Sequence, residues 1–193
     1  MWDRVDGAWK LRLDAGGVAV LQKSQPPEIL FIERRVQLLK PGSGRMAILV
    51  PNGILNNPAL GYVRRWLLTH TQVLAVVDMA RELLQPKNDT QTSMLLLRRL
   101  SDAEVASVGR RGLDYPIFMA VTEKIGHDKR GNVFYRRDDK GDDILVEQDV
   151  PVRDIDEHTG EEVLTRVLVR ERVIDDDLPE IALAYRQWLT EQA

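Results

Sequence analysis

Residues 31–55 constrain the possible fold more than any other part of the chain. In this stretch, apolar side chains at helical spacing lead into Pro41-Gly42, then a short apolar run, then Pro51-Asn52-Gly53. Proline and glycine end regular structure, so these two breakers bound separate elements. The run at 46–50 is too short for a helix and does not alternate with polar residues, which is typical of a strand buried on both faces. We therefore expect a helix, a turn and a central parallel strand, the order found in α/β folds.

One helix is predicted before that strand and another after it. Pro26-Pro27 opens the first, because proline favours a first turn, and Asn57-Pro58 opens the second, which ends near His70. The side chains expected to face inward are Ile29, Ile32, Val36 and Leu39, and then Leu60, Val63 and Leu67. Apolar strands follow at 73–77 and 92–97. This alternation predicts right-handed βαβ units and an α/β sheet through residue 100.

The two ends of the chain carry weaker patterns. Residues 1–24 are polar and contain Gly16-Gly17, so we expect a loop with a short strand at 18–21. After Ser101 charged residues become denser, and strands are predicted at 115–121 and 133–137. A half-exposed hairpin is predicted over 150–155 and 163–170, and a final helix over 178–189, capped by Asp177. We divide the chain into an α/β part, residues 1–100, and a β-rich extension ending in a helix, residues 101–193.

Composition narrows the functional classes. The chain has 193 residues, 44% of them hydrophobic, which is enough to bury a core. Its formal net charge is −3, so it is not the basic body of a protein that holds DNA by electrostatics alone. It has no cysteine, which excludes disulfides and thiolate chemistry and suits a reducing cytoplasm. No apolar run approaches the roughly 18 residues of a membrane span, so we expect no membrane association.

Several blocks of the sequence resemble one family. Phe31-Ile32-Glu33-Arg34, then Leu38-Leu39-Lys40-Pro41-Gly42, then a strand ending in Pro51-Asn52-Gly53-Ile54-Leu55 closely resemble the modification subunits of type I restriction-modification systems. Residues 115–132 and 175–181 are similar to two further blocks of those proteins. The family consists of adenine-specific DNA methyltransferases. The resemblance implies a Rossmann-like, three-layer sheet, S-adenosylmethionine as cofactor, and DNA, specificity and restriction subunits as partners of the complete enzyme.

The resemblance covers the carboxyl-terminal half of the family's catalytic domain. The family's Phe-x-Gly-x-Gly cofactor turn and its Asn-Pro-Pro-Phe loop, which binds the target amine, do not occur in this chain. Gln25-Pro26-Pro27-Glu28 lacks the short amide and the aromatic of that loop and is interpreted as a helix start. Gly42-Ser43-Gly44 follows a helix and precedes a strand, the reverse of a phosphate-binding turn. We expect no cofactor to bind, and no catalytic residue to act, in this chain alone.

The resemblance implies a functional role for three features of the sequence. Each of them also has an interpretation as a purely structural element. Phe31 matches an aromatic that forms a wall of the cofactor's adenine pocket, whereas the helical pattern without the resemblance favours a core phenylalanine. Asn52 and Gly53 follow a predicted parallel strand, where α/β sheets bind ligands, or they form a plain turn. The segment from Glu82 to Ser93 is similar to one that lies beside a flipped base. Its candidate DNA-facing residues are Leu84, Lys87, Asn88, Thr90 and Thr92.

That loop departs from the family at one position. A phenylalanine usually precedes Pro86 and can stack on the extruded adenine, but Leu83-Leu84 stand there in this chain. The alternative is a polar surface loop. His127 and His158 have too few partners for a metal site, and Asp175-Asp176-Asp177 fits a helix N-terminus better than a cation site. The sequence therefore predicts a fragment of an adenine-specific DNA methyltransferase that needs its amino-terminal half or self-associates. A non-catalytic scaffold or assembly module is the alternative.

Overall fold

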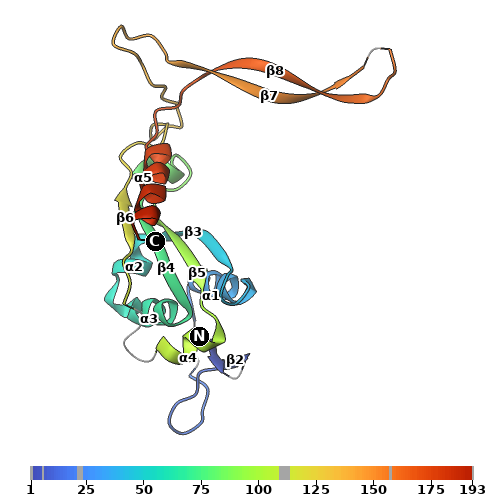
Figure 1. Ribbon diagram of the computed structural model, residues 1–193. Helices are drawn as coiled ribbons and strands as arrows, with labels where there is room; N and C mark the ends of the chain where they lie inside the picture. Colours follow the sequence, from blue (N-terminus) through green and yellow to red (C-terminus); the bar gives the residue numbers. More distant parts are fainter. Residues whose placement is uncertain (1, 6, 21–23, 109–113, 157, 193) are drawn as a thin grey trace.

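The computed structural model describes residues 2–5, 7–20, 24–108, 114–156 and 158–192. Its body is a four-stranded sheet with helices packed against it, and a long two-stranded hairpin projects from that body (Figure 1). The prediction of a mixed α/β fold is confirmed at this level. Among the described residues, no helix is long and apolar enough to cross a membrane.

The sheet contains β3 (Arg45–Pro51), β4 (Thr71–Asp78), β5 (Thr92–Arg99) and β6 (Phe118–Val121) in the order β3-β5-β4-β6. β5 runs antiparallel to both β3 and β4, whereas β6 runs parallel to β4. The expectation of a central parallel strand at 46–50 is therefore wrong. Within the described part of the chain, β3 pairs with β5 alone and forms an edge, and its side chains alternate between more and less buried positions. A short apolar run has the same appearance in either position, because periodicity is hard to read over five residues.

The first face of the sheet is covered by α1 (Pro27–Leu38) and α3 (Gly61–His70). Between β3 and α3 lie the short helices α2 (Asn52–Asn56) and η1 (Pro58–Leu60), which the sequence did not indicate separately. α1 begins at Pro27 and ends at Leu38, and α3 ends at His70, close to the positions predicted from proline and apolar spacing. α3 begins at Gly61 rather than at Asn57-Pro58, because residues 58–60 form η1. The core residues buried between these helices and the sheet are Ile29, Ile32, Val36, Val50, Val63, Trp66, Leu67, Leu95 and Leu97.

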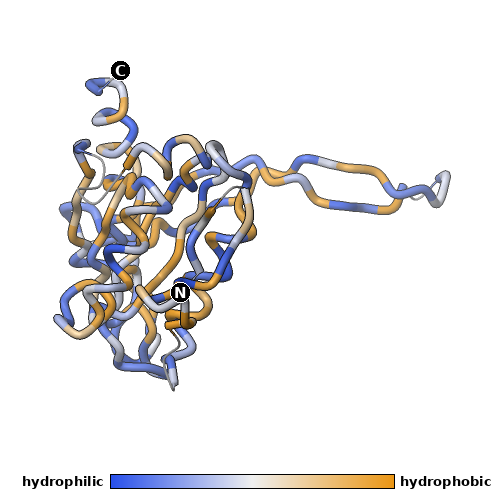
Figure 2. The backbone as a smooth tube through the Cα atoms, turned by 90° about the horizontal axis from the view of Figure 1, so that it is seen from below, coloured by the Kyte–Doolittle hydropathy of each residue, from blue (hydrophilic) through white to orange (hydrophobic). Residues whose placement is uncertain are grey.

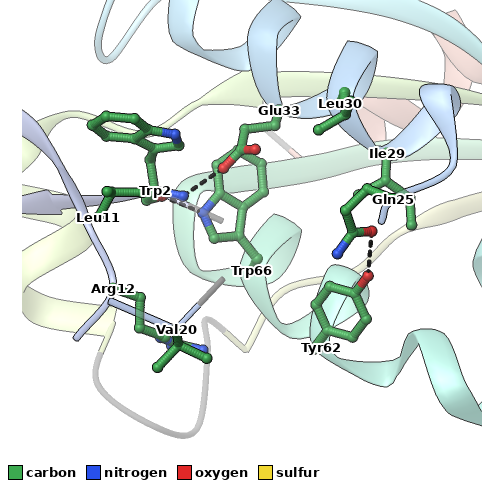
Figure 3. A pocket seen from close by; sticks show the side chains of 10 residues that line it. All are labelled: Trp2, Leu11, Arg12, Val20, Gln25, Ile29, Leu30, Glu33, Tyr62 and Trp66. Carbon is green, nitrogen blue, oxygen red and sulfur yellow. Dashed lines mark hydrogen bonds between the residues drawn. The ribbon is translucent and has the colours of Figure 1, made fainter. Parts of the chain in front are cut away.

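The amino-terminal segment forms structure that the sequence analysis missed. β1 (Trp2–Val5) and β2 (Ala8–Leu11) pair as an antiparallel hairpin where a loop was expected. The indole of Trp66 donates to the Trp2 carbonyl (2.6 Å), and the Trp2 amide donates to the Glu33 carboxylate, so the hairpin is joined to α1 and α3 (Figure 3). Instead of a strand at 18–21, a single bridge joins Leu13 to Ala19; residue 21 lies outside the described residues.

The second half of the chain adds to the same body. α4 (Asp102–Val108) begins with a reciprocal cap in which the Ser101 hydroxyl accepts from the Glu104 amide and the Glu104 carboxylate accepts from the Ser101 amide. α5 (Leu178–Glu191) packs against β6 through the rings of Tyr185 and Trp188 around Phe118. β6 and α5 thus lie beyond residue 100 and still contribute to the sheet and its surroundings. The division at residue 100 stays a prediction.

Two details of the second half differ from expectation. Residues 133–137 form isolated bridges, Tyr135 to Ile174 among them, and no continuous strand. The Asp177 side chain does not cap its own helix, because its carboxylate accepts from the amides of Glu123 and Lys124 (2.7 and 2.8 Å). Asp177 therefore joins the start of α5 to the segment after β6. The aspartates before α5 serve this connection as well as the helix terminus.

The predicted hairpin is confirmed and is longer than the sequence indicated. β7 (Leu145–Ile155) and β8 (Glu162–Arg172) pair antiparallel over their whole length. Both views show this ribbon extending away from the sheet and helices as a twisted arm (Figures 1 and 2). Nearly every side chain in it is exposed, rather than half-exposed as expected.

Candidate functional site

The carboxyl ends of β3 and β4 meet at one edge of the sheet. Both strands run antiparallel to β5, which lies between them, so both end beside its first residues. There the Asn52 side-chain amide donates to Asp78 Oδ1 (3.0 Å), and the Ser93 hydroxyl donates to Asn52 Oδ1 (2.8 Å). Ser93 Oγ also lies 3.3 Å from Asp78 Oδ1, and Gln91 Nε2 lies 3.4 Å from the same oxygen. We call Asn52, Asp78, Gln91 and Ser93 the edge cluster.

The edge cluster is largely fixed by its own contacts. The Asn52 backbone amide donates to the Gln91 carbonyl (3.0 Å), so main chain as well as side chains join the end of β3 to the start of β5. Gly53 is exposed, and an added Cβ would meet no atom within 4 Å, so its absence of a side chain is not required by packing. Asn52 is thus part of a hydrogen-bonded cluster, and Gly53 lies at its solvent side.

The loop after β4 is held by a second set of polar contacts. It starts with η2 (Arg81–Leu84), and the Arg81 guanidinium contacts the Asp89 carboxylate through two hydrogen bonds, the shorter of 2.6 Å. Hydrogen bonds from Arg81 and then from Gln85 lower the pKa of Asp89 to about 2. These contacts close residues 81–89 into a defined turn whose tip faces solvent.

The candidate DNA-facing residues of this loop differ in accessibility. Lys87, Asn88 and Thr90 are exposed, although the Asn88 side-chain oxygen already accepts from the amide and hydroxyl of Thr90 (2.9 and 2.6 Å). Leu84 is half-buried. Thr92 is only 4% exposed, and its hydroxyl has no hydrogen-bond partner among the described residues. Lys87 is therefore exposed and, unlike Asn88 and Thr90, takes no part in the hydrogen bonds that hold this loop.

Leu83, next to Leu84, lines an apolar cleft on the second face of the sheet. The cleft has a volume of about 470 Å³ and lies between the sheet and α5. Its walls come from Leu49, Ala75, Val77, Met79, Leu83, Met94, Leu96, Phe118, Leu178, Ile181, Ala182 and Tyr185. α5 covers this face only in part, since the cleft stays open between the two layers.

Phe31 lies at a different place, beside the free edge of β3. Its side chain is 63% exposed, so it is not a core residue of this chain. Together with Arg35 on the same helix, it lines a groove of about 480 Å³ whose floor is residues 46–49 of β3. Phe31 lies on α1 beside residues 46–49, whereas the edge cluster begins at Asn52, after β3 has ended.

Sequence reasoning found one member of the edge cluster and missed the other three. Asp78, Gln91 and Ser93 are 26, 13 and 41 residues away from their partners in the cluster, and only the antiparallel course of β5 brings them together. A usable signal was present for Asp78, which ends an apolar strand where α/β sheets place polar ligands. For Ser93 the position inside an expected strand gave no such signal. Across the described ranges no group of three or more potential ligands could hold a metal ion. His158 lies in a turn as expected, whereas His127 forms an isolated bridge with Val133.

No protein-family model matches this chain, and no curated protein matches it. In structure the chain is distantly similar to a protein from Vibrio vulnificus YJ016 that is described as a modification subunit of a type I restriction enzyme. The identity is 20% and the TM-score 0.43, over 60% of this chain and 23% of that one. A protein from Listeria monocytogenes described as a class I S-adenosylmethionine-dependent methyltransferase gives 19% identity and a TM-score of 0.37, over 48% of this chain and 26% of that one. The chain spans about a quarter of the length of each.

Proposed function

We propose that this chain is the carboxyl-terminal part of the catalytic domain of an adenine-specific DNA methyltransferase of the type I modification class. In the complete enzyme a methyl group passes from S-adenosylmethionine to the exocyclic amine of adenine. This part supplies strands of the sheet, one wall of the cofactor pocket through Phe31, and a loop that faces DNA. It is inactive alone, because the cofactor turn and the Asn-Pro-Pro-Phe loop are absent from its sequence.

The edge cluster is the observation that carries this proposal. Two segments that resemble separate blocks of the family, Pro51-Asn52-Gly53 and the loop from Glu82 to Ser93, are joined there by direct hydrogen bonds. The cluster lies at the carboxyl ends of two parallel-running strands, the edge at which α/β sheets bind their ligands. Lys87 extends from the same loop and can reach a phosphate.

The free edge of β3 supports the proposal that the sheet is incomplete in this chain. The Arg99 amide donates to the Gly44 carbonyl and the Asn52 amide to the Gln91 carbonyl, which fixes the alternation along the ladder. Even-numbered residues of β3 therefore direct their backbone groups to β5, and Arg45, Ala47 and Leu49 direct theirs outward. Within the part of the chain that the structure describes, these amides and carbonyls have no strand to pair with, so they are a template for one more strand. We propose that the amino-terminal half of the catalytic domain supplies it, with Phe31 and Arg35 at the junction.

Co-expression with a homologous amino-terminal half tests the proposal. That half carries the cofactor turn and the Asn-Pro-Pro-Phe loop. We expect the two pieces to copurify, to bind S-adenosylmethionine by calorimetry, and to methylate adenine when a specificity subunit is added. This chain alone should bind the cofactor negligibly. Micromolar cofactor binding by this chain alone, or two pieces that neither associate nor methylate, would refute it.

A non-catalytic assembly module is the second candidate. The observation that favours it is the amount of apolar surface left uncovered, including Phe31 and the cleft beside α5. Such surface marks protein interaction sites whether or not chemistry follows. Stable association with a partner, without cofactor binding in any combination of subunits, would support the module over the enzyme.

A further inference from the structure

The arm formed by β7 and β8 has one face made mostly of valine. In an antiparallel ladder, directly opposed residues share a face and successive residues alternate between faces. The register pairs Val150 with Val167, and the residues at every second position from them share that face. We call this the valine face; its apolar members are Val146, Val150, Val152, Val163, Val167 and Val169.

The other face of the arm is of a different kind. There Arg166 contacts Asp149 (2.9 Å) and Arg170 contacts Glu147 (2.9 Å), so ion pairs bridge the two strands. The apolar residues that lie among these charges are Leu145, Pro151, Ile155, Leu164 and Leu168. A face of paired charges remains well hydrated, whereas the valine face carries only Gln148 and Thr165 as polar residues between its two ends.

The valine face lies open in this chain. Val146, Val152 and Val167 are 39%, 41% and 45% exposed, and the arm extends away from the body (Figure 2). An isolated two-stranded ribbon is marginal in water, and it becomes stable when its apolar face packs on a third element. The arm is therefore built to be covered.

Charge on the arm indicates what covers it. The valine face has an acidic residue at each end, Asp154 near the tip and Glu171 near the base. Residues 145–172 hold eight acidic and four basic side chains. A second copy laid face to face would bring Asp154 or Glu171 against a like charge in either two-fold orientation, which is unfavourable. Nucleic acid is disfavoured for the same reason.

Dimensions indicate the shape of the occupant. Two strands about 4.8 Å apart form a strip about as wide as an α-helix with its side chains, roughly 10 Å. Asp154 and the position opposite Glu171 are eight residues apart on β7. At about 3.4 Å per residue this span is about 27 Å, the length of a helix of about 18 residues.

We propose that the valine face is the docking site for an amphipathic helix of a partner protein, with an apolar stripe and Lys or Arg at both ends. The stripe covers the valines, and the basic ends meet Asp154 and Glu171. The inference does not depend on the proposed enzyme, because it uses the arm alone.

Labelled synthetic helices test this proposal with the full chain. One 18-residue peptide carries a Leu and Ala stripe with Lys at both ends; a second is identical but carries Glu there. Fluorescence anisotropy should show binding of the Lys peptide and at least about tenfold weaker binding of the Glu peptide. Equal affinity for both peptides, or binding of neither at millimolar concentration, would overturn the proposal.

Matched variants locate the contact. The double substitution Val150→Thr with Val167→Thr keeps β-branched side chains but adds hydroxyls to the valine face. It should weaken binding of the Lys peptide by about tenfold. Leu164→Thr with Leu168→Thr makes the same kind of change on the opposite face and should leave affinity within about twofold. Asp154→Asn with Glu171→Gln should reduce both affinity and its salt dependence. If only the two leucine substitutions weaken binding of the Lys peptide, the valine face is not the docking site. If the two valine substitutions instead abolish self-association of the chain in sedimentation, the occupant of the valine face is a second copy and not a basic helix.

Discussion

Asn52 Nδ2 lies 3.0 Å from Asp78 Oδ1, and this contact joins the ends of two strands that do not pair with each other. Ser93 Oγ lies 3.3 Å and Gln91 Nε2 3.4 Å from the same oxygen. A single carboxylate oxygen is therefore surrounded by polar atoms of the residue that follows β3 and of two residues near the start of β5. Removing it leaves several partly buried donors without an acceptor at once.

Asp78→Ala should consequently destabilise the chain. We expect a loss of about 1–3 kcal/mol in the free energy of unfolding, the cost of leaving buried donors unsatisfied. Urea titration followed by circular dichroism measures it. Asp139→Ala, in an exposed turn, is the control and should change stability by less than about 0.5 kcal/mol. A loss no larger than that of the control would show that water replaces the cluster without cost.

Stability should fall on mild acidification because of His70. Burial lowers the pKa of His70 below 6.5, beside the rings of Trp9 and Trp66. The unfolded chain then binds a proton that the folded chain does not, so this contribution is complete above about pH 7 and is lost as pH falls through 6.5 toward the folded value. The slope should reach up to about 1 kcal/mol per pH unit. His70→Gln should remove that slope in urea titrations from pH 7.5 to 5.5; an identical slope in the variant would assign it to other groups.

The reciprocal cap at the start of α4 should contribute to the stability of the chain at neutral pH. Hydrogen bonds from Arg98 and then from the Ser101 amide lower the pKa of Glu104 to about 2. The contribution of this carboxylate is present above its unfolded value and is lost as pH falls through about 2. Ser101→Ala should cost about 1 kcal/mol at pH 7, the usual value of a cap. Ser107→Ala, at an exposed position of the same helix, is the matched control. Equal losses in both variants would show that the cap contributes nothing of its own.

The free edge of β3 should cause self-association. Ala47→Pro removes an outward-directed amide without touching the ladder to β5, and Ala47→Lys adds a charge that discourages edge pairing. Sedimentation should show dimers or larger species for the unmodified chain and monomers for both variants. A stable monomer before any substitution would argue for a self-contained module.

The loop prediction needs the complemented enzyme. Lys87→Ala should weaken binding to all DNA sequences about equally and flatten the salt slope by about one unit, since one phosphate contact is lost. Leu84→Phe should strengthen the hold on a flipped adenine by about 1–3 kcal/mol through stacking. Affinity and methylation rate are compared between a duplex with a mismatched target adenine and a fully paired one. Should neither substitution change either quantity, the loop does not touch DNA.

Local patterns in the sequence predicted local structure well. Proline at a first turn and apolar spacing located α1 and α3, and the same kind of reasoning located the arm. The Ser101 and Glu104 pair that caps α4 was readable in the same way and was overlooked. What the sequence could not supply was strand order. The run at 46–50 looks alike at the centre or the edge of a sheet, and its direction relative to β5 depends on partners far along the chain.

The candidate site shares this limit. Asn52 was found from its place after a strand, but its link to Ser93 crosses 41 residues and exists only because β5 reverses direction. Phe31 was assigned to the cofactor pocket from a resemblance, and helical spacing alone favoured a core residue. Its 63% exposure comes from the lack of a strand beyond β3 within the described chain, which no local pattern records.

Pro51 limits how far any added strand can follow β3. By the alternation of the ladder its nitrogen faces the open edge, yet proline has no hydrogen there to donate. A neighbouring chain can keep register from Arg45 to Leu49 and then loses its last donor, one residue before Asn52. Pairing of an added strand therefore ends at Pro51, where the chain leaves the sheet to begin α2 at Asn52. This limit lies on the side of β3 opposite to β5 and β4, so a strand added there extends the sheet without displacing the hydrogen bond between Asn52 and Asp78.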